Sequence, residues 1–349
     1  MKKYLCLYIL CVLLIAILGC PQKKESVKPQ PPLPPKQPSV VTTPKISTEE
    51  EKPEITETPP LSEAAEPNLR PKETLAPNET KPKPEPAKNT LGEFNQKYAS
   101  VLMTYVDEEG KVDYSKLRLK RLDLIETQNI IRSLKPQEYK TWSEKDKIAF
   151  WINAYNLEML KIIVQNYPIE SYRILHVLPS WSPDSVRHID RRINGIKKQK
   201  FIIMEEEFTL ESIEERFFNK EFNDPRIFFA ISFYCTTGGP PLRNEPYNGK
   251  KLDKQLDDQV RTYISSRYGF GIDEEDKTVH LSPILKKQQF GQEFLKKYGT
   301  KKKFKDHPPV IRAVLNFLIN YLPKNQVNFL ETRRYDVKFI ILNWNLNEQ

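Results

Sequence analysis

The sequence has few of the residues that bind metals or act as nucleophiles: its 349 residues include only four cysteines and four histidines. Structural zinc sites usually show closely spaced histidine and cysteine ligands. Here His188 and Asp190 form one His-x-Asp pair, and no further ligand cluster accompanies them. We therefore predict no metal site and no cofactor.

The sequence also lacks an aromatic-rich nucleic-acid-binding motif beside its basic residues. The net charge is +9, and part of it lies in the lysine-rich run 296–307. Such a run is found both on polyanion-binding surfaces and in solvated loops. We expect a solvated loop here, and no nucleic-acid partner.

Residues 1–20 have the pattern of a secretion signal. Lys2 and Lys3 precede the apolar run 4–19, which ends at Gly19, directly before Cys20. A positive start, an apolar stretch and a small residue before the cleavage site are typical of such signals. The end of the run resembles the lipobox of bacterial lipoproteins. That resemblance implies that residues 1–19 are removed and that Cys20 is lipidated; a short transmembrane anchor and cleavage elsewhere are the alternatives.

The lipobox resemblance also implies a location. Lipoproteins kept at a Gram-negative inner membrane often carry Asp after the cysteine, whereas Pro21 and Gln22 follow here. We expect a lipid anchor in the cell envelope, on the outer membrane facing the periplasm if the host is Gram-negative. With Cys6 and Cys11 removed and Cys20 acylated, Cys235 is the only free thiol, so no intrachain disulfide is expected.

Residues 20–90 are expected to be a disordered tether. Residues 21–90 hold 17 of the 29 prolines and no Gly, Phe, Trp, Tyr or Cys. Without aromatic side chains the segment buries too little surface to offset its ordering entropy. Its prolines favour the extended polyproline II conformation, in which 70 residues reach roughly 200 Å. Spacing of a domain from a membrane is the simplest function, and docking of a partner on the proline motifs is the alternative.

Residues 91–349 are expected to form one compact domain, because no second linker interrupts them. The apolar patterns mix helix and strand and predict an α+β or α/β fold. Ser143 begins a helix whose apolar positions fall on one face, and Pro168 closes it. Other helices are predicted after Thr209, over 252–264 and over 310–322, and strands over 200–204, 226–235 and 279–281 and in the C-terminal tail.

The segment 224–252 is the predicted binding site. After the expected buried strand it contains paired glycines, paired prolines and several polar side chains. Glycines in such a loop turn backbone N–H groups toward an anion, and loops at strand ends are where open sheets bind ligands. A rigid structural turn is the alternative. The candidate binding residues, including an ionic network and a polar wall from the preceding helix, are Asn153, Asn156, Asp224, Arg226, Gly238, Gly239, Arg243 and Tyr247.

Several motifs in this domain resemble the family called domain of unknown function 547. They are EEGKVDYSKL (108–117), KIAFWINAYNLEML (147–160), FTLESIEERFF (208–218), DPRIFFAISF (224–233), PPLRNEPYNGKKLDKQLDDQ (240–259), VHLSPIL (279–285) and LNWNLN (342–347). The resemblance runs from near Phe94 to the C-terminus. It implies no established activity, although members have been likened to papain-type thiol hydrolases.

The chain departs from its relatives where that chemistry would occur. By the resemblance, relatives commonly carry cysteine or histidine at the positions of Gly239, Phe228 and Glu215. A thiol nucleophile needs a histidine base within hydrogen-bond reach. The remaining candidates for catalysis are Cys235 and His280, and an inert buried Cys235 is the favoured interpretation.

These observations predict an envelope lipoprotein that binds an extended peptide or a fragment of an envelope polymer through a degenerate hydrolase-like site. We lean against an enzyme. A cysteine hydrolase that uses Cys235 and a non-catalytic scaffold are the two alternatives. The oligomeric state does not follow from the sequence.

Overall fold

The computed structural model describes residues 89–169, 185–192, 195–286, 294–299 and 302–349. All of them belong to the second of the two units into which the chain divides, Glu79–Gln349. The signal, the lipidation residue Cys20 and the proline-rich tether lie outside the described residues. Among the described helices, none has the length and apolar character needed to cross a membrane.

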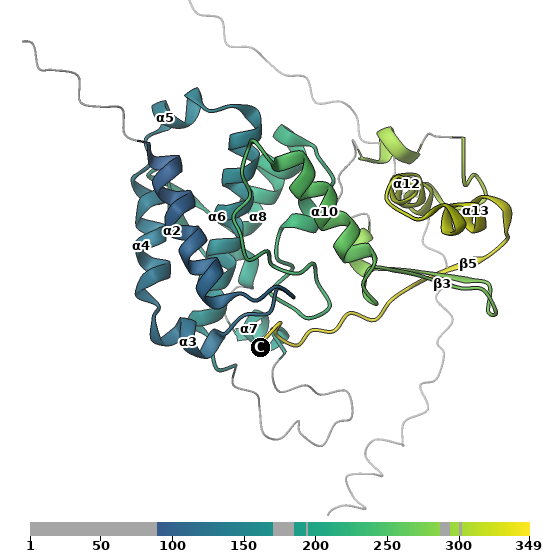
Figure 1. Ribbon diagram of the computed structural model, residues 1–349, viewed down its shortest axis with the longest axis horizontal. Helices are drawn as coiled ribbons and strands as arrows, with labels where there is room; N and C mark the ends of the chain where they lie inside the picture. Colours follow the sequence, from purple (N-terminus) through teal and green to yellow (C-terminus); the bar gives the residue numbers. More distant parts are fainter. Residues whose placement is uncertain (1–88, 170–184, 193–194, 287–293, 300–301) are drawn as a thin grey trace, which may run out of the picture. The chain divides into compact units, whose positions relative to one another are not determined.

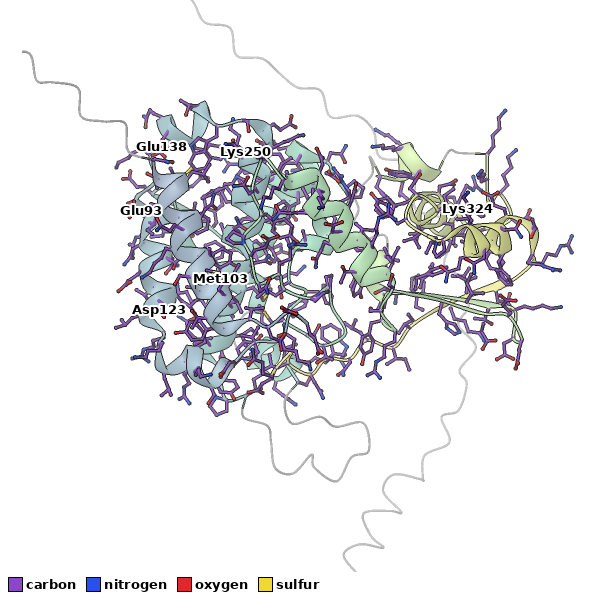
Figure 2. The ribbon with its side chains drawn as sticks, viewed as in Figure 1. Glu93, Met103, Asp123, Glu138, Lys250 and Lys324 are labelled. Atoms are coloured by element: carbon purple, nitrogen blue, oxygen red, sulfur yellow. The ribbon has the colours of Figure 1, made fainter. Side chains whose placement is uncertain are left out.

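Helices at the start of the unit surround one long central helix (Figure 1). Apolar side chains at helical spacing on the first of them, including Phe94, Tyr98, Val101 and Tyr105, are buried in the core. The helices of this part are α2 (Thr90–Tyr105), α3 (Tyr114–Leu119), α4 (Leu122–Ser133), α5 (Pro136–Thr141) and α6 (Glu144–Gln165). Glu138 of α5 lies at the start of α2 (Figure 2), where its carboxylate accepts hydrogen bonds from the Thr90 N–H and hydroxyl at 2.8 and 2.6 Å.

The central helix α6 begins as predicted at Ser143. The Ser143 hydroxyl accepts a hydrogen bond from the Asp146 N–H at 3.1 Å and donates one to the Asp146 carboxylate at 2.7 Å. The apolar face is buried as predicted, and burial extends further, to every residue from Ile148 to Leu160. Helices α2, α3, α4 and α8 (Leu210–Ile213) all contact α6, so no side of its middle turns faces water.

The strands form two small sheets. Strands β1 (Phe201–Ile203) and β2 (Glu206–Phe208) make an antiparallel hairpin. In the other sheet the order is β3 (Phe270–Asp273), β4 (Thr278–Leu281) and β5 (Asp336–Phe339), with β3 antiparallel and β5 parallel to β4. Most of the described structure is helical and the sheets are separate from the helical layer, so the fold is α+β.

The remaining elements include the predicted helices after Thr209, over 252–264 and from 310, and they correct one prediction. They are α7 (Arg187–Arg192), η2 (Ile196–Lys198), η3 (Glu214–Phe222), α9 (Ile227–Ala230), α10 (Leu252–Ile264), η4 (Pro283–Leu285), α12 (Pro309–Leu318) and α13 (Lys324–Thr332). The predicted strand 226–235 is wrong: its apolar residues are buried, but they begin with the short helix α9. The Asp224 side chain accepts a hydrogen bond from the Arg226 N–H at 2.9 Å and so starts a turn.

Candidate functional site

Two asparagines of α6 hold the two ends of the segment 230–247. The Asn156 side chain accepts from the Ser232 N–H at 2.7 Å and donates to the Ala230 carbonyl at 3.0 Å. The Asn153 side chain, one turn earlier, exchanges two 2.9 Å hydrogen bonds with the N–H and carbonyl of Tyr247. All four hydrogen bonds join an asparagine side chain to the backbone of the segment. The side chains of Asn153 and Asn156 therefore hold the segment in place.

The glycine pair is used for close packing within the protein. A Cβ on Gly238 would lie 2.6 Å from the Asn343 backbone nitrogen, and the Gly238 N–H donates to the Asn343 carbonyl at 3.0 Å. The Gly239 N–H donates to the Thr236 carbonyl at 3.0 Å. Neither glycine has a positive φ; Tyr234 and Cys235 do. Both N–H groups are therefore bonded within the protein, and the expectation that these glycines turn free N–H groups toward an anion is wrong.

Asp224, Arg226 and Arg243 do not form the single ionic network that the sequence suggests. The half-buried Arg226 guanidinium binds the carboxylates of Asp224 at 2.7 Å, Asp253 at 3.0 Å and Asp257 at 2.9 Å. Burial disfavours the charged guanidinium, but the hydrogen bonds that it donates to these carboxylates raise the pKa of Arg226. Arg243 instead pairs with Glu245 at 2.5 Å.

Replacing Arg226 by Ala is expected to lower the free energy of unfolding by about 2 kcal/mol, because three carboxylates lose a shared partner and two of them are half exposed. Hydrogen bonds from Lys145 and then Arg226 lower the pKa of Asp253. The stabilisation of the folded state by the Arg226–Asp253 ion pair is fully present above the unfolded pKa of Asp253, roughly 3.9. It is lost as the pH falls through the lower pKa that Asp253 has in the folded state. Urea titrations at pH 7 and pH 3 should show the difference from wild type shrinking at pH 3; a constant difference would contradict this assignment.

The environment of Cys235 keeps its thiol neutral. The side chain is 1% exposed, and the Ser232 hydroxyl donates to its sulfur at 3.2 Å. Burial raises the pKa of the Cys235 thiol to about 11, although hydrogen bonds from Ser232 and Tyr114 oppose the shift. His280 lies on β4, opposite Gly271 of β3 and Lys338 of β5. A thiol with a raised pKa and hydroxyl neighbours is the opposite of an activated nucleophile.

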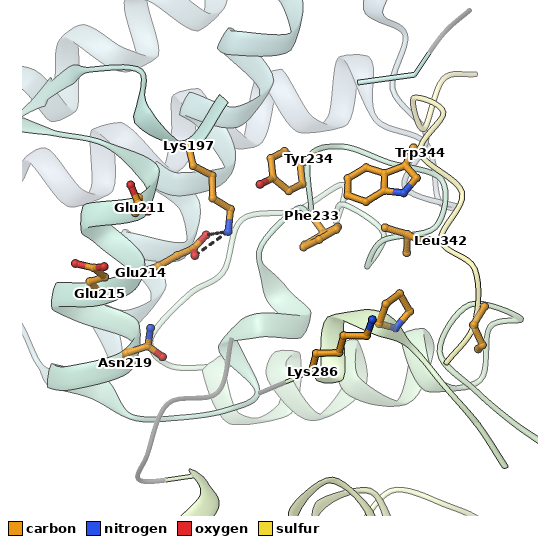
Figure 3. Close-up of a pocket in the computed structure, with 12 residues that line it drawn as sticks. Lys197, Glu211, Glu214, Glu215, Asn219, Phe233, Tyr234, Lys286, Leu342 and Trp344 are labelled. Atoms are coloured by element: carbon orange, nitrogen blue, oxygen red, sulfur yellow. Dashed lines mark hydrogen bonds and ion pairs between the residues drawn. The ribbon is translucent and has the colours of Figure 1, made fainter. Parts of the chain in front are cut away.

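A pocket of about 520 Å³ lies near the start of the same loop, and one of its walls is acidic. Glu211, Glu214, Glu215 and Asn219, from α8 and η3, line this side; Glu214 points across toward Lys197, whereas the Glu211 and Glu215 side chains are exposed at the rim (Figure 3). Glu214 is already engaged: Lys197 binds it at 2.7 Å and the Tyr155 hydroxyl donates to it at 2.7 Å. No ion pair joins Glu211 or Glu215 to another described residue, and the buried Asn219 Oδ1 has no partner among them. This wall offers three free acceptors.

The facing wall of the pocket is aromatic and apolar. Phe233, Tyr234 and Trp344 contact one another, with ring centroids 4.9 to 6.0 Å apart. Leu342 lies beside them and Lys286 closes another side (Figure 3). We call this cavity, with its acidic and aromatic walls, the Glu–Trp pocket. It suits a ligand with a cationic or hydrogen-bond-donating group on one side and an apolar or flat group on the other.

Comparison with known proteins assigns the central part of this domain to a family. Residues 139–264 match the family model DUF547, described as a protein of unknown function. The chain contains a DUF547 domain. No curated protein and no solved structure matches the chain. The DUF547 match covers α6, the acidic wall of the Glu–Trp pocket and the segment 224–252.

Two of the three positions at which the resemblance predicts a departure from relatives lie at or beside this pocket. Glu215 lines the pocket. A Cβ on Gly239 would lie 2.9 Å from the Cβ of Phe233, which lines it too. The third position, Phe228, is a buried core side chain. At the pocket itself this chain carries the Glu215 carboxylate, at a position where the resemblance predicts an imidazole.

None of the candidate binding residues of the sequence analysis lines this pocket. Tyr247 instead lines a second cavity of about 460 Å³, together with Glu245, Asn248 and Gln255. Their contact with a ligand stays a prediction. Sequence reasoning did not identify the acidic wall or Trp344 as parts of a site. A signal was present, since Glu211 and Glu215 are four residues apart in a DUF547 motif and so share one helix face.

Proposed function

We propose that this DUF547 domain is a non-catalytic binding domain that holds an amine-bearing segment of an extended peptide or envelope polymer in the Glu–Trp pocket. The observation that carries the proposal is the pairing of two walls. Glu211, Glu215 and the Asn219 carbonyl line one side of the cavity with no ion pair or hydrogen bond to another described residue, and three aromatic rings line another.

An ammonium or guanidinium group matches the acidic wall, because carboxylates form their strongest hydrogen bonds with charged donors. The methylene stem behind such a group, or a flat ring, matches the aromatic wall. Lys197 and Lys286 at the margins leave room for a negative group on the same ligand. The neutral, buried Cys235 supports binding over thiol hydrolysis, and a cavity of this size supports binding over a scaffold role.

The proposal includes the cellular setting. The signal pattern of residues 1–20 supports anchoring through lipidated Cys20, and the composition of residues 21–90 supports a long spacer. The domain would then sample envelope material at up to roughly 200 Å from its membrane.

Binding of a peptide library tests this function. Fluorescent octapeptides with Lys fixed at one position should bind the full-length protein, and the Glu211→Gln/Glu215→Gln variant should bind about tenfold more weakly because two charged acceptors are lost. The matched control is Glu274→Gln/Glu275→Gln, which removes two exposed carboxylates of the β3–β4 turn. Equal affinity of all three proteins, or equal binding of a library with Glu in place of Lys, would refute the proposal.

A further inference from the structure

We propose that Lys197 fills a cation subsite of the Glu–Trp pocket, formed by the Glu214 carboxylate and the Tyr234 ring, and that an ammonium group of the ligand binds there by displacing it. All three residues line the pocket (Figure 3). This inference rests on the proposed function, and it names the subsite and the class of charged group that fills it.

The Lys197 ammonium group makes the contacts that the proposed function assigns to a ligand. Its Nζ lies 2.7 Å from one carboxylate oxygen of Glu214 and 2.8 Å from the other. It also lies 5.5 Å from the centroid of the Tyr234 ring. A carboxylate and an aromatic face are the two groups that attract an ammonium group most strongly in proteins. A lysine side chain of the ligand would reproduce these contacts.

Glu214 is held in place without Lys197. The hydroxyl of Tyr155, on the central helix α6, donates to the Glu214 carboxylate at 2.7 Å. Tyr155 is 1% exposed, and burial, followed by the Glu214 charge, raises the pKa of Tyr155, so this hydroxyl keeps the proton that it donates. The carboxylate is therefore positioned from the interior of the protein and stays preorganised for another cation.

Lys197 is the movable partner of the ion pair. Its backbone lies on η2, where the neighbouring Ile196 is fully buried in the core. Its side chain is a flexible four-carbon stem, and among the described residues its ammonium group interacts only with Glu214 and Tyr234. The side chain is 23% exposed, so a rotation of the stem moves the charge toward the rim without opening the core.

An exchange of ammonium groups avoids the main cost of opening this ion pair. Removing one partner of a largely buried pair leaves an uncompensated charge in a poorly solvated site. A ligand ammonium that replaces Lys197 keeps Glu214 paired. The displaced ammonium has acceptors at the rim, because Glu211 and Glu215 are exposed there and have no ion pair with another described residue. The rim and the subsite then share two ammonium groups, one from the ligand and one from Lys197.

Peptide binding to charge variants of the full-length protein tests the displacement. Lys197→Met keeps an apolar stem and frees Glu214, so it should bind a lysine octapeptide from the library about tenfold more tightly than wild type. Adding Glu214→Gln should remove this gain. The matched control is Lys286→Met, which removes the other lysine of the pocket and leaves Glu214 paired. Because Lys286 is exposed and its charge is screened, affinity should change less than about threefold.

A small amine tests the subsite without the peptide. Propylammonium has the carbon chain and the ammonium group that Lys197→Ala removes. Calorimetric titration should show saturable binding to Lys197→Ala that is about tenfold tighter than to wild type and is lost when Glu214→Gln is added. Propanol, which has the same chain without the charge, should not bind. Circular dichroism checks that the Lys197→Ala and Lys197→Met proteins are folded, and either folded variant decides the question.

The outcomes separate this inference from the proposed function. Peptide that binds through Glu211 and Glu215 with equal affinity to wild type and Lys197→Met, without propylammonium binding to Lys197→Ala, would overturn displacement and leave the pocket function standing. An equal gain from Lys286→Met would mean that net charge alone sets the affinity, and would also overturn it. Propylammonium bound at Glu214, with no peptide bound by any variant, would refute the proposed function and support the subsite.

Discussion

Iodoacetamide should alkylate Cys235 about 100-fold more slowly in the folded protein than in the guanidinium-unfolded protein at the same pH. Burial raises the pKa of this thiol to about 11, about two units above the ordinary value of a cysteine, and only the thiolate reacts. The side chain is 1% exposed, so steric exclusion adds to the effect. Mass spectrometry of the peptide that contains Cys235 follows this residue separately from Cys6, Cys11 and Cys20.

A thiol introduced nearby gives the matched control for this measurement. Thr237 is exposed and lies two residues after Cys235, so Thr237→Cys should react at nearly the rate of the unfolded chain. If Cys235 itself reacts quickly at neutral pH, with a rate that follows a pKa near 7, the thiol is activated. The hydrolase alternative would then replace the binding domain.

Replacing Asn153 by Ala should lower the free energy of unfolding by about 3 kcal/mol. The change leaves the N–H and the carbonyl of Tyr247 without their partners in a buried environment, and each unsatisfied group costs roughly 1–3 kcal/mol. Asn153→Asp should be similarly harmful, because a carboxylate accepts from the N–H but faces the carbonyl with like charge. Urea unfolding followed by circular dichroism measures both.

The control for Asn153 is its neighbour Asn95. Asn95 only receives a long 3.4 Å contact from the Asn153 side chain, so Asn95→Ala should cost less than about 1 kcal/mol. Equal losses for Asn95→Ala and Asn153→Ala would mean that the clamp on Tyr247 contributes little to stability.

The sequence predicted the elements whose local signals agree with their tertiary setting. Ser143 caps α6, Thr209 caps α8 with a reciprocal pair of hydrogen bonds to Ser212, and α10 covers 252–264 as its apolar spacing indicates. The apolar run after Asp224 was predicted as a strand but begins with a helix. A short, continuously apolar sequence is compatible with either element. The Asp224 turn, which decides the matter, depends on one side-chain-to-backbone bond.

The candidate site was harder to predict than the fold. The polar and glycine residues of 224–252 looked like ligand groups, yet most bind other parts of the chain, as Asn153 and Gly238 show. The residues that line the Glu–Trp pocket come from five segments that are separated in the sequence. Only the tertiary fold brings Glu215 and Trp344 to the same cavity. Sequence spacing reveals neighbours on one helix and does not reveal which element stands across a cavity.

Zero-length cross-linking tests the central claim most directly. A carbodiimide joins a bound ligand amine to a protein carboxylate that touches it, with loss of water and conversion of the carbodiimide to a urea. With the lysine octapeptide and the full-length protein, mass spectrometry should find the peptide attached at Glu211 or Glu215 and displaced by excess unlabelled peptide. Attachment spread evenly over exposed carboxylates such as Glu274 and Glu275, with no excess at Glu211 or Glu215, would contradict the assignment of the Glu–Trp pocket as the binding site.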